Sequence, residues 1–193
     1  MTIDPLLTLA ISTSSPALSI ALVEGATVLA RHHALIGRGH AEALVPAIAD
    51  LLGERRPARI IVDTGPGSYT GIRIGIAAAR ALGLAWEVEV LGTSALSLVA
   101  AQAITQSPGL PGVWALIDAG RGQVAGGWIG PDLVAPKPAL LRSAPEGATL
   151  AGAGTRLLPD APAPVHDSHP DAGFAGCLGG AALGPPAALY VAD

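Results

Sequence analysis

The segment "DTGPGSYTGIRIG", residues 63–75, decides how the rest of this sequence is interpreted. It holds four glycines, one proline and a run of hydroxyl residues, and it lies between an apolar stretch and an alanine-rich one. Loops of this composition often bind phosphate where a strand passes into a helix. The segment is therefore either a phosphate-binding loop or a turn that only begins a helix.

Three known loop motifs fail at specific positions. A Walker A loop needs a lysine directly after its last glycine, but Gly71 is followed by Ile72. A nucleophile elbow needs a glycine two residues before its serine, and Pro66 precedes Ser68 there. A dinucleotide fingerprint needs a third glycine where Thr70 stands. None of these motifs assigns a phosphate or an acyl-transfer role to the segment.

The interpretation that remains is a turn from a strand into a helix. Gly65 and Gly67 supply unusual backbone dihedral angles, and Ser68 or Thr70 caps the helix. Binding of an anion at the N-terminus of this helix remains an alternative. Arg73, just after the loop, either faces an anion or forms an ion pair, and the sequence does not separate these roles.

Apolar patterning around the segment predicts an α/β fold. Three strands with short turns come first, and then helices and strands alternate. This order gives a mixed sheet with an antiparallel start and a parallel remainder, flanked by helices. The predicted strands are 6–12, 17–24, 27–35, 58–63 and 87–92, and the predicted helices lie within 37–52, 71–86 and 94–106.

A linker at 107–112 divides the chain into an N-terminal lobe, 1–106, and a smaller C-terminal lobe, 107–193. The C-terminal lobe begins with strands at 113–119 and 122–130. After residue 131, proline, glycine and alanine dominate and periodicity fades, so this lobe is expected to be rich in loops.

Composition favours a folded, cytoplasmic protein. Of the 193 residues, 50% are hydrophobic and 13% are charged, which argues against disorder. The net charge of −4 without a long basic run argues against a surface that grips nucleic acid unaided. The single cysteine, Cys177, cannot form an internal disulfide, which fits a reducing compartment. Prolines and polar residues interrupt the uncharged stretch 90–117, so we expect no membrane span.

Four runs of the sequence are "LAISTSSPALSIAL", "RGHAEALVPAIADLL", "DTGPGSYTGIRIGIAAARALGLA" and "VLGTSALSLVA". Over about residues 6–104 they resemble the TsaB (YeaZ) family of the actin-like ATPase superfamily. Beyond this region the resemblance extends to a hairpin, "ALIDAGRGQVAGGW", and faintly to the ending "AALYVAD". It implies an actin-like, ribonuclease H-like fold of two lobes, the second small and degenerate.

The resemblance implies a supporting role rather than catalysis. Members of the family are non-catalytic partners of TsaD in bacterial synthesis of threonylcarbamoyladenosine at tRNA position 37. The ATPase TsaE joins that complex, contact with tRNA is indirect, and ATP or ADP would bind only at the interface of the assembled complex. The sequence leaves open whether the chain forms a homodimer when this partner is absent. No cofactor, metal site or membrane contact of its own is implied.

The residues of the first hairpin and the first helix agree with a protein that lacks the metal-binding groups of its catalytic relatives. The family usually shows D-T-S in that hairpin, whereas this chain has Ser12, and a hydroxyl is a much weaker ligand for a hard cation than a carboxylate. The catalytic relative holds metal with two histidines one turn apart. Here His40 is alone, because Ala43 and Leu44 occupy the following turn.

Two enzymatic alternatives remain open from the residues. One is a free-standing actin-like ATPase or kinase that uses Asp118 and the loop 65–71, although Asp118 also suits a turn or cap. The other is a metallopeptidase-like enzyme. "AGAG" at 151–154 is interpreted as a plain turn. His166, Asp167, His169 and Asp171 are interpreted as a solvated loop rather than a metal site, being in a proline-rich segment.

Small residues recur every four positions along the helix after the loop, at Gly71, Gly75, Ala79 and Gly83. An internal glycine costs a helix about 0.5–1 kcal/mol relative to alanine, so close packing against a neighbour is expected. That neighbour is either this chain or a partner, and the family resemblance favours the partner. The sequence thus predicts a partner interface on this stripe, with His40 and Glu42 included, and predicts that Gly75→Leu breaks association while the monomer stays folded.

Overall fold

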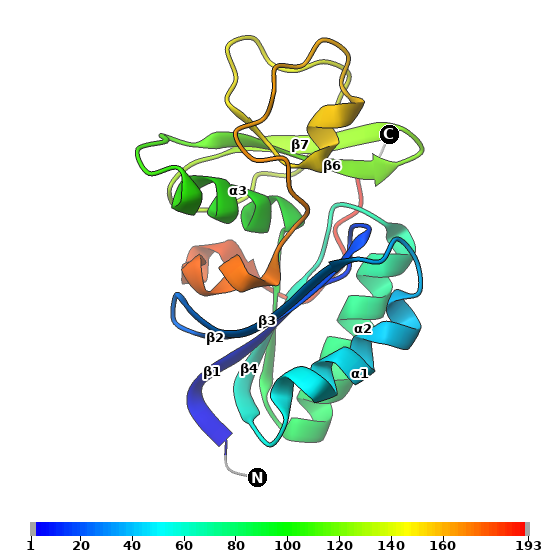
Figure 1. Ribbon diagram of the computed structural model, residues 1–193, viewed down its shortest axis with the longest axis vertical. Helices are drawn as coiled ribbons and strands as arrows, with labels where there is room; N and C mark the ends of the chain where they lie inside the picture. The colour runs from blue at the N-terminus through cyan, green and yellow to red at the C-terminus, as the bar shows by residue number, and fades with distance from the viewer. Residues whose placement is uncertain (1–2, 192–193) are drawn as a thin grey trace.

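The computed structural model describes residues 3–191 and arranges them as two stacked lobes (Figure 1). The first lobe is built on a six-stranded sheet of order β10-β5-β4-β1-β2-β3. Strands β1, β2 and β3 are antiparallel neighbours, whereas β1, β4 and β5 are parallel, which confirms the predicted mixed sheet. Its strands are β1 (Ile3–Ser12), β2 (Ala17–Glu24), β3 (Thr27–Leu35), β4 (Arg56–Asp63), β5 (Glu89–Thr93) and β10 (Leu183–Gly184).

Two helices, α1 (His40–Leu52) and α2 (Tyr69–Trp86), cover one face of this sheet (Figure 1). Leu44, Ile48 and Leu52 of α1 recur at helical spacing and are buried against the strands. The helix continues through Pro46, whose exposed position leaves solvent to satisfy the carbonyl group that loses its donor.

The opposite face of the sheet is covered by the C-terminal part of the chain. The short 3-10 helix η2 (Ala172–Cys177) packs there beside α3 (Ala95–Gln106), with Ala172 and Ala175 against Ala10, Ala21 and Ile61. Those small side chains explain how an irregular segment fits closely against the strands.

The second lobe holds a four-stranded sheet of order β8-β7-β6-β9. The hairpin of β6 and β7 confirms the two strands predicted after the linker, and the short elements beyond it confirm the loop-rich remainder. The elements of this lobe are β6 (Val113–Gly120), β7 (Gln123–Ile129), β8 (Ala139–Leu141), β9 (Leu150–Ala151) and η1 (Ala153–Leu157). The short 3-10 helix η3 (Gly180–Ala182) lies beside β5 of the first lobe and leads into β10.

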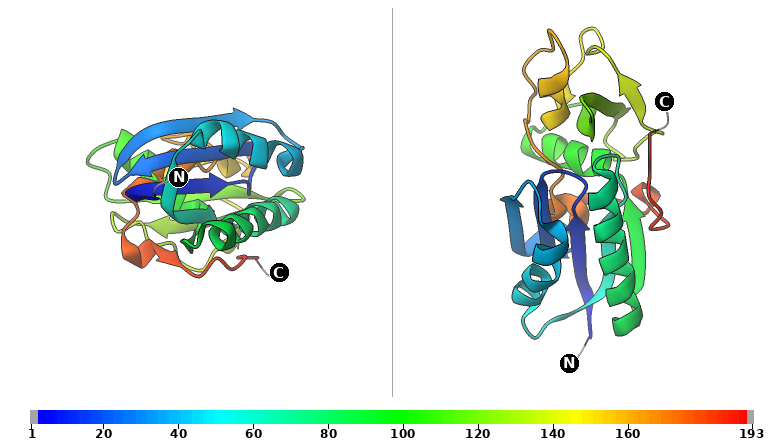
Figure 2. Two further views of the ribbon diagram at one scale, coloured as in Figure 1. Left: turned by 90° about the horizontal axis from the view of Figure 1, so that it is seen from below. Right: turned by 90° about the vertical axis from the view of Figure 1, so that its right-hand side faces the viewer.

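The packing revises the predicted lobe boundary in two places. Helix α3 was expected in the first lobe, but most of its buried side chains pack against β6 and β7 of the second lobe. The C-terminal segment returns to the first lobe, where β10 pairs with β5 and the chain then runs beside α2 (Figure 2). A single cut at 106/107 therefore fails, because residues from both ends of the chain form the first lobe and the segment between them, α3 included, forms the second. The last two residues of the run "AALYVAD" lie outside the described part.

Within residues 3–191, none of the helices is both long enough and apolar enough to span a bilayer.

Candidate functional site

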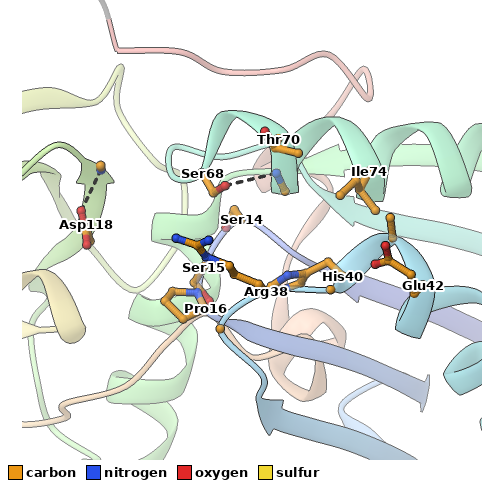
Figure 3. Close-up of a pocket in the computed structure, with 15 residues that line it drawn as sticks. Ser14, Ser15, Pro16, Arg38, His40, Glu42, Ser68, Thr70, Ile74 and Asp118 are labelled. Atoms are coloured by element: carbon orange, nitrogen blue, oxygen red, sulfur yellow. Dashed lines mark hydrogen bonds between the residues drawn. The ribbon is translucent and has the colours of Figure 1, made fainter.

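A cavity of about 480 Å³ opens between the two lobes (Figure 3). Its walls come from the turn after β1, the start of α1, the loop before α2 and, across the gap, Asp118 of β6. The predicted loop 65–71 therefore lies at the cleft, as an active actin-like site would require. The side chains that line it include Ser14, Arg38, Glu42, Ser68 and Thr70.

The backbone donors of the loop are engaged within the protein. The amide of Gly65 donates to Asp63 Oδ1 at 2.7 Å, and the amide of Ser68 donates to the carbonyl of Ser14 at 2.6 Å. The amide of Gly71 donates to Ser68 Oγ at 3.2 Å, so Ser68 is the cap of α2, as one of the two predicted choices (Figure 3). A phosphate cradle needs free amide groups, and here three of them already have partners.

The conformations of the loop glycines agree with their predicted use. Gly65 has φ +97° and Gly67 has φ +148°, a region that other residues rarely adopt. Thr70 does not cap the helix and its side chain is exposed beside the cleft.

The carboxylates Asp118 and Asp63 lie in different surroundings. Asp118 is exposed and accepts a hydrogen bond from the amide of Gly120 at 2.7 Å, the turn role considered from the sequence. Asp63 is buried beneath the loop, where burial raises its pKa and hydrogen bonds from Ser14, Ser12 and Gly65 oppose that rise. Among residues 3–191, no group of three or more His, Cys, Asp and Glu side chains is placed to bind a metal ion.

Comparison with known proteins adds the family. A model described as "TsaD: tRNA N6-adenosine threonylcarbamoyltransferase" matches residues 32–129, just over half of the chain. The structure described as YeaZ from Pseudomonas aeruginosa is 30% identical, with a TM-score of 0.72 over 87% of each chain. The chain belongs to the TsaB (YeaZ) family. The likeness to YeaZ also supports the predicted actin-like fold.

Two curated members of the family are proteins named "tRNA threonylcarbamoyladenosine biosynthesis protein TsaB". The one from Bacillus subtilis (strain 168) is 36% identical over 121 residues, and the one from Escherichia coli (strain K12) is 37% identical over 121 residues. Each match covers 60% of this chain and 52% of the relative. The chain spans about half the length of the curated relatives it matches.

The glycine stripe of α2 faces the protein's own sheet, which corrects the interface predicted for it. Gly71, Gly75, Ala79 and Gly83 are all buried in the first lobe. A Cβ atom on Gly75 would lie 2.5 Å from Thr13 Oγ1 and 3.5 Å from Val62 Cγ2. Gly71 lies against the backbone of Thr13, and Gly83 against Val90. The small residues bring α2 close to β1, β4 and β5, so the close neighbour is this chain.

His40 and Glu42 have different places in the same helix. His40 is buried, with Nε2 3.3 Å from the carbonyl oxygen of Ala17, so its ring joins α1 to the hairpin rather than presenting itself to a partner. Glu42 is exposed in the first turn of α1, where a carboxylate is favourable for the helix dipole. Only Glu42 of this pair remains available for an interface.

Arg73 lies beside aromatic rings rather than beside a carboxylate. Its guanidinium is 3.9 Å from the ring centre of Tyr69, and its Nε donates to Tyr190 Oη at 3.0 Å. The two tyrosine rings are 5.1 Å apart. This exposed cluster joins the C-terminal segment to the start of α2. It is neither the anion contact nor the ion pair that the sequence suggested for Arg73.

The four polar residues of the loop 166–171 separate into different contacts. His166 Nε2 lies 3.2 Å from Ser107 Oγ, and Asp167 pairs with Arg156 at 2.7 Å. Burial lowers the pKa of His169. Asp171 is buried rather than solvated, which corrects the expectation for that residue.

A buried polar cluster around Asp171 was missed from the sequence. Asp171 forms an ion pair with Arg31 of β3, and its Oδ1 lies 3.3 Å from Ser19 Oγ and 3.8 Å from His33 Nδ1. Ser19 Oγ lies 3.0 Å from the same nitrogen of His33. A serine hydrolase needs the serine and the acid on opposite ring nitrogens and an accessible serine, and Ser19 is fully buried. The cluster instead attaches η2 to the sheet.

Proposed function

We propose that this chain is a non-catalytic subunit that binds and supports TsaD during threonylcarbamoyladenosine synthesis on tRNA. Membership of the TsaB family supports this role, as do the names of its two curated relatives. The cleft adds support, because the carboxylates that line it among residues 3–191 are the exposed Asp118 and Glu42, and the hairpin position expected to hold an acid is Ser12.

The observation that carries the proposal is an apolar surface on α1 and α2 that points away from the sheet. Leu84 is 83% exposed and Val45 is 54% exposed, and exposed apolar side chains that gather on one surface mark an interaction site. We name this surface the outer helical face. It consists of Ala41, Val45 and Ala49 of α1 with Ala77, Ala81, Leu84 and Ala85 of α2, all exposed.

The family resemblance implies pairing with TsaD through the helices of this lobe, and the outer helical face is the surface these helices leave uncovered. Small side chains between two larger aliphatic ones allow helices of a partner to approach closely. We therefore assign TsaD to this face and propose a second copy of the chain there when TsaD is absent.

The remaining parts of the proposal concern the assembly. TsaE joins the complex, tRNA is contacted indirectly, and any ATP or ADP binds only where the assembled subunits meet. The chain works in the cytoplasm and needs no cofactor of its own.

A reconstitution assay tests the catalytic part. Unmodified tRNA, a donor of the threonylcarbamoyl group and either this chain, TsaD or both are combined, and modified adenosine is measured by mass spectrometry. We expect no product from this chain alone and much more from the pair than from TsaD alone. Product from the chain alone would favour the enzyme alternatives, and an unchanged yield on adding it to TsaD would remove the supporting role.

A charge placed on the outer helical face tests the docking part. Val45→Asp/Leu84→Asp is expected to weaken binding of TsaD by more than about tenfold, because buried aliphatic anchors dominate such interfaces. The matched control is Leu157→Asp, at an exposed leucine of the second lobe. Sedimentation of each variant with TsaD gives the affinity, and thermal melts confirm that the variants are folded. Equal affinity for the two variants contradicts this docking surface.

A further inference from the structure

The ends of β1 and β4 meet at one buried carboxylate. The two strands are parallel neighbours in which Ile11 lies beside Val62, so Ser12 and Asp63 occupy the next position on each. Their side chains point to the same face of the sheet, and Ser12 Oγ donates a hydrogen bond to Asp63 Oδ2 at 2.7 Å. Asp63 is 1% exposed, and none of the salt bridges formed among residues 3–191 includes it.

Three donors from separate segments converge on this carboxylate. Ser14 Oγ shares Oδ2 with Ser12, and the amide of Gly65 donates to Oδ1 at 2.7 Å. The donors belong to the end of β1, to the turn after it and to the loop before α2. A buried carboxylate is tolerated when several hydrogen bonds compensate its lost hydration, and these donors are neutral hydroxyl and amide groups.

The same turn positions the start of α2. Thr13 Oγ1 donates to the carbonyl of Gly71 at 2.7 Å, and the carbonyl of Ser14 accepts from the amide of Ser68 at 2.6 Å. A shift of the turn would therefore move the cap of α2 and the wall of the cleft. Asp63 fixes the position of this turn through its hydrogen bonds with Ser12 and Ser14. It therefore positions the wall of the cleft without lining the cleft itself.

We propose that Asp63 is the positioning residue of the cleft and that it occupies, from β4, the space for the acid expected at position 12 of β1. Only one carboxylate fits this junction. Two ionised carboxylates at hydrogen-bonding distance repel one another, and burial prevents water from screening them. Position 12 and position 63 are therefore coupled: an acid at one requires a hydroxyl at the other. This inference does not depend on TsaD or on tRNA.

A charge exchange between the two positions tests the coupling. Ser12→Asp is expected to destabilise the natural background, where it adds a second buried carboxylate. In the Asp63→Ser background the same change restores one carboxylate facing two hydroxyls and is expected to stabilise. Ser12→Asp/Asp63→Asn is made in parallel, in case the serine leaves a cavity. Urea unfolding of the isolated chain measures each variant, and we expect coupling of about tenfold or more in the unfolding equilibrium constant.

A matched control separates this coupling from net charge. Ser12→Asp/Asp50→Ser carries the same net charge as the exchange variant, but Asp50 is exposed on α1. Ser12→Asp should therefore lower the stability in this background as much as it does in the natural chain. Amide hydrogen exchange gives a local readout, because protection at Gly65 and Ser68 should fall in Asp63→Ser more than protection in the second lobe. If Ser12→Asp has the same effect in every background, or if both double variants at these positions are as unstable as Ser12→Asp alone, the proposal is wrong.

Discussion

The two faces of the six-stranded sheet are buried by different means. On the face under α1 and α2, the core is aliphatic, and the glycines of α2 allow its backbone to lie close to the strands. On the face under η2, small apolar residues alternate with buried polar ones, including Ser12, Asp63 and Asp171. The first face is stabilised by close packing of apolar side chains, whereas the second depends on each polar group having its partner.

The difference teaches what a pattern of small residues can and cannot predict. The four-residue repeat in α2 correctly indicated close packing on one side of the helix. It did not indicate which neighbour is packed, because a strand of the same chain and a helix of a partner both require small side chains there. The partner surface proposed here lies on the other side of α2, where the residues are exposed alanines and a leucine.

Among the variants that test the difference between the two faces, Gly75→Leu is expected to have the largest effect on stability. A leucine side chain would enter the space of Thr13, whose hydroxyl is bonded to the carbonyl of Gly71, and of Val62 in β4, so we expect the chain to unfold. The matched control is Ala77→Leu on the exposed side of α2, which should change stability by about 0.5 kcal/mol or less. Circular dichroism melts compare them. A folded Gly75→Leu monomer would contradict the close packing of the stripe against the sheet.

The apolar face was predictable from the sequence, and the polar face was not. Leu44, Ile48 and Leu52 show their burial through helical spacing, which depends only on nearby residues. Asp171 shows no such signal, because its partner Ser19 is 152 positions away and the segment between them contains both lobes. Asp63 was visible at the start of the glycine loop, but a carboxylate there suits a cleft or a core equally until Ser12 and Ser14 are placed beside it.

Asp171→Ala is the next test, on the polar face. Alanine removes the acceptor for Ser19 and for the amide of Gly173, and it leaves Arg31 without its ion pair, so we expect a loss of about 2–3 kcal/mol. The matched control is Asp167→Ala, which removes another aspartate that forms an ion pair with an arginine. Asp167 also pairs with an arginine, at 2.7 Å, but both side chains are exposed, and the expected loss is below about 1 kcal/mol. Urea unfolding decides between them, and equal losses would mean that burial adds nothing to the contact of Asp171.

The smallest effect is expected when the pH is changed and the two half-buried histidines near this face, His33 and His169, gain protons. Burial lowers the pKa of His33 below its usual value of 6.5; Asp171 opposes that shift, while Arg31 and His32 add to it. Burial also lowers the pKa of His169, with Arg156 and His33 contributing in the same direction and Asp167 and Asp118 opposing. A lowered pKa means that the unfolded chain binds more protons than the folded chain between the folded value and 6.5.

Stability should therefore fall as the pH decreases through 6.5 and stop falling, for these two groups, once the pH is below their folded pKa values. Replacing both histidines by glutamine removes their share of this slope. The expected change is below about 1 kcal/mol for each residue, because solvent screens half-buried groups. Urea unfolding at pH 7.5, 6.5 and 5.5 measures it. An unchanged slope in His33→Gln/His169→Gln would mean that these rings gain and lose protons equally in both states, and that the polar face of the sheet does not sense pH through them.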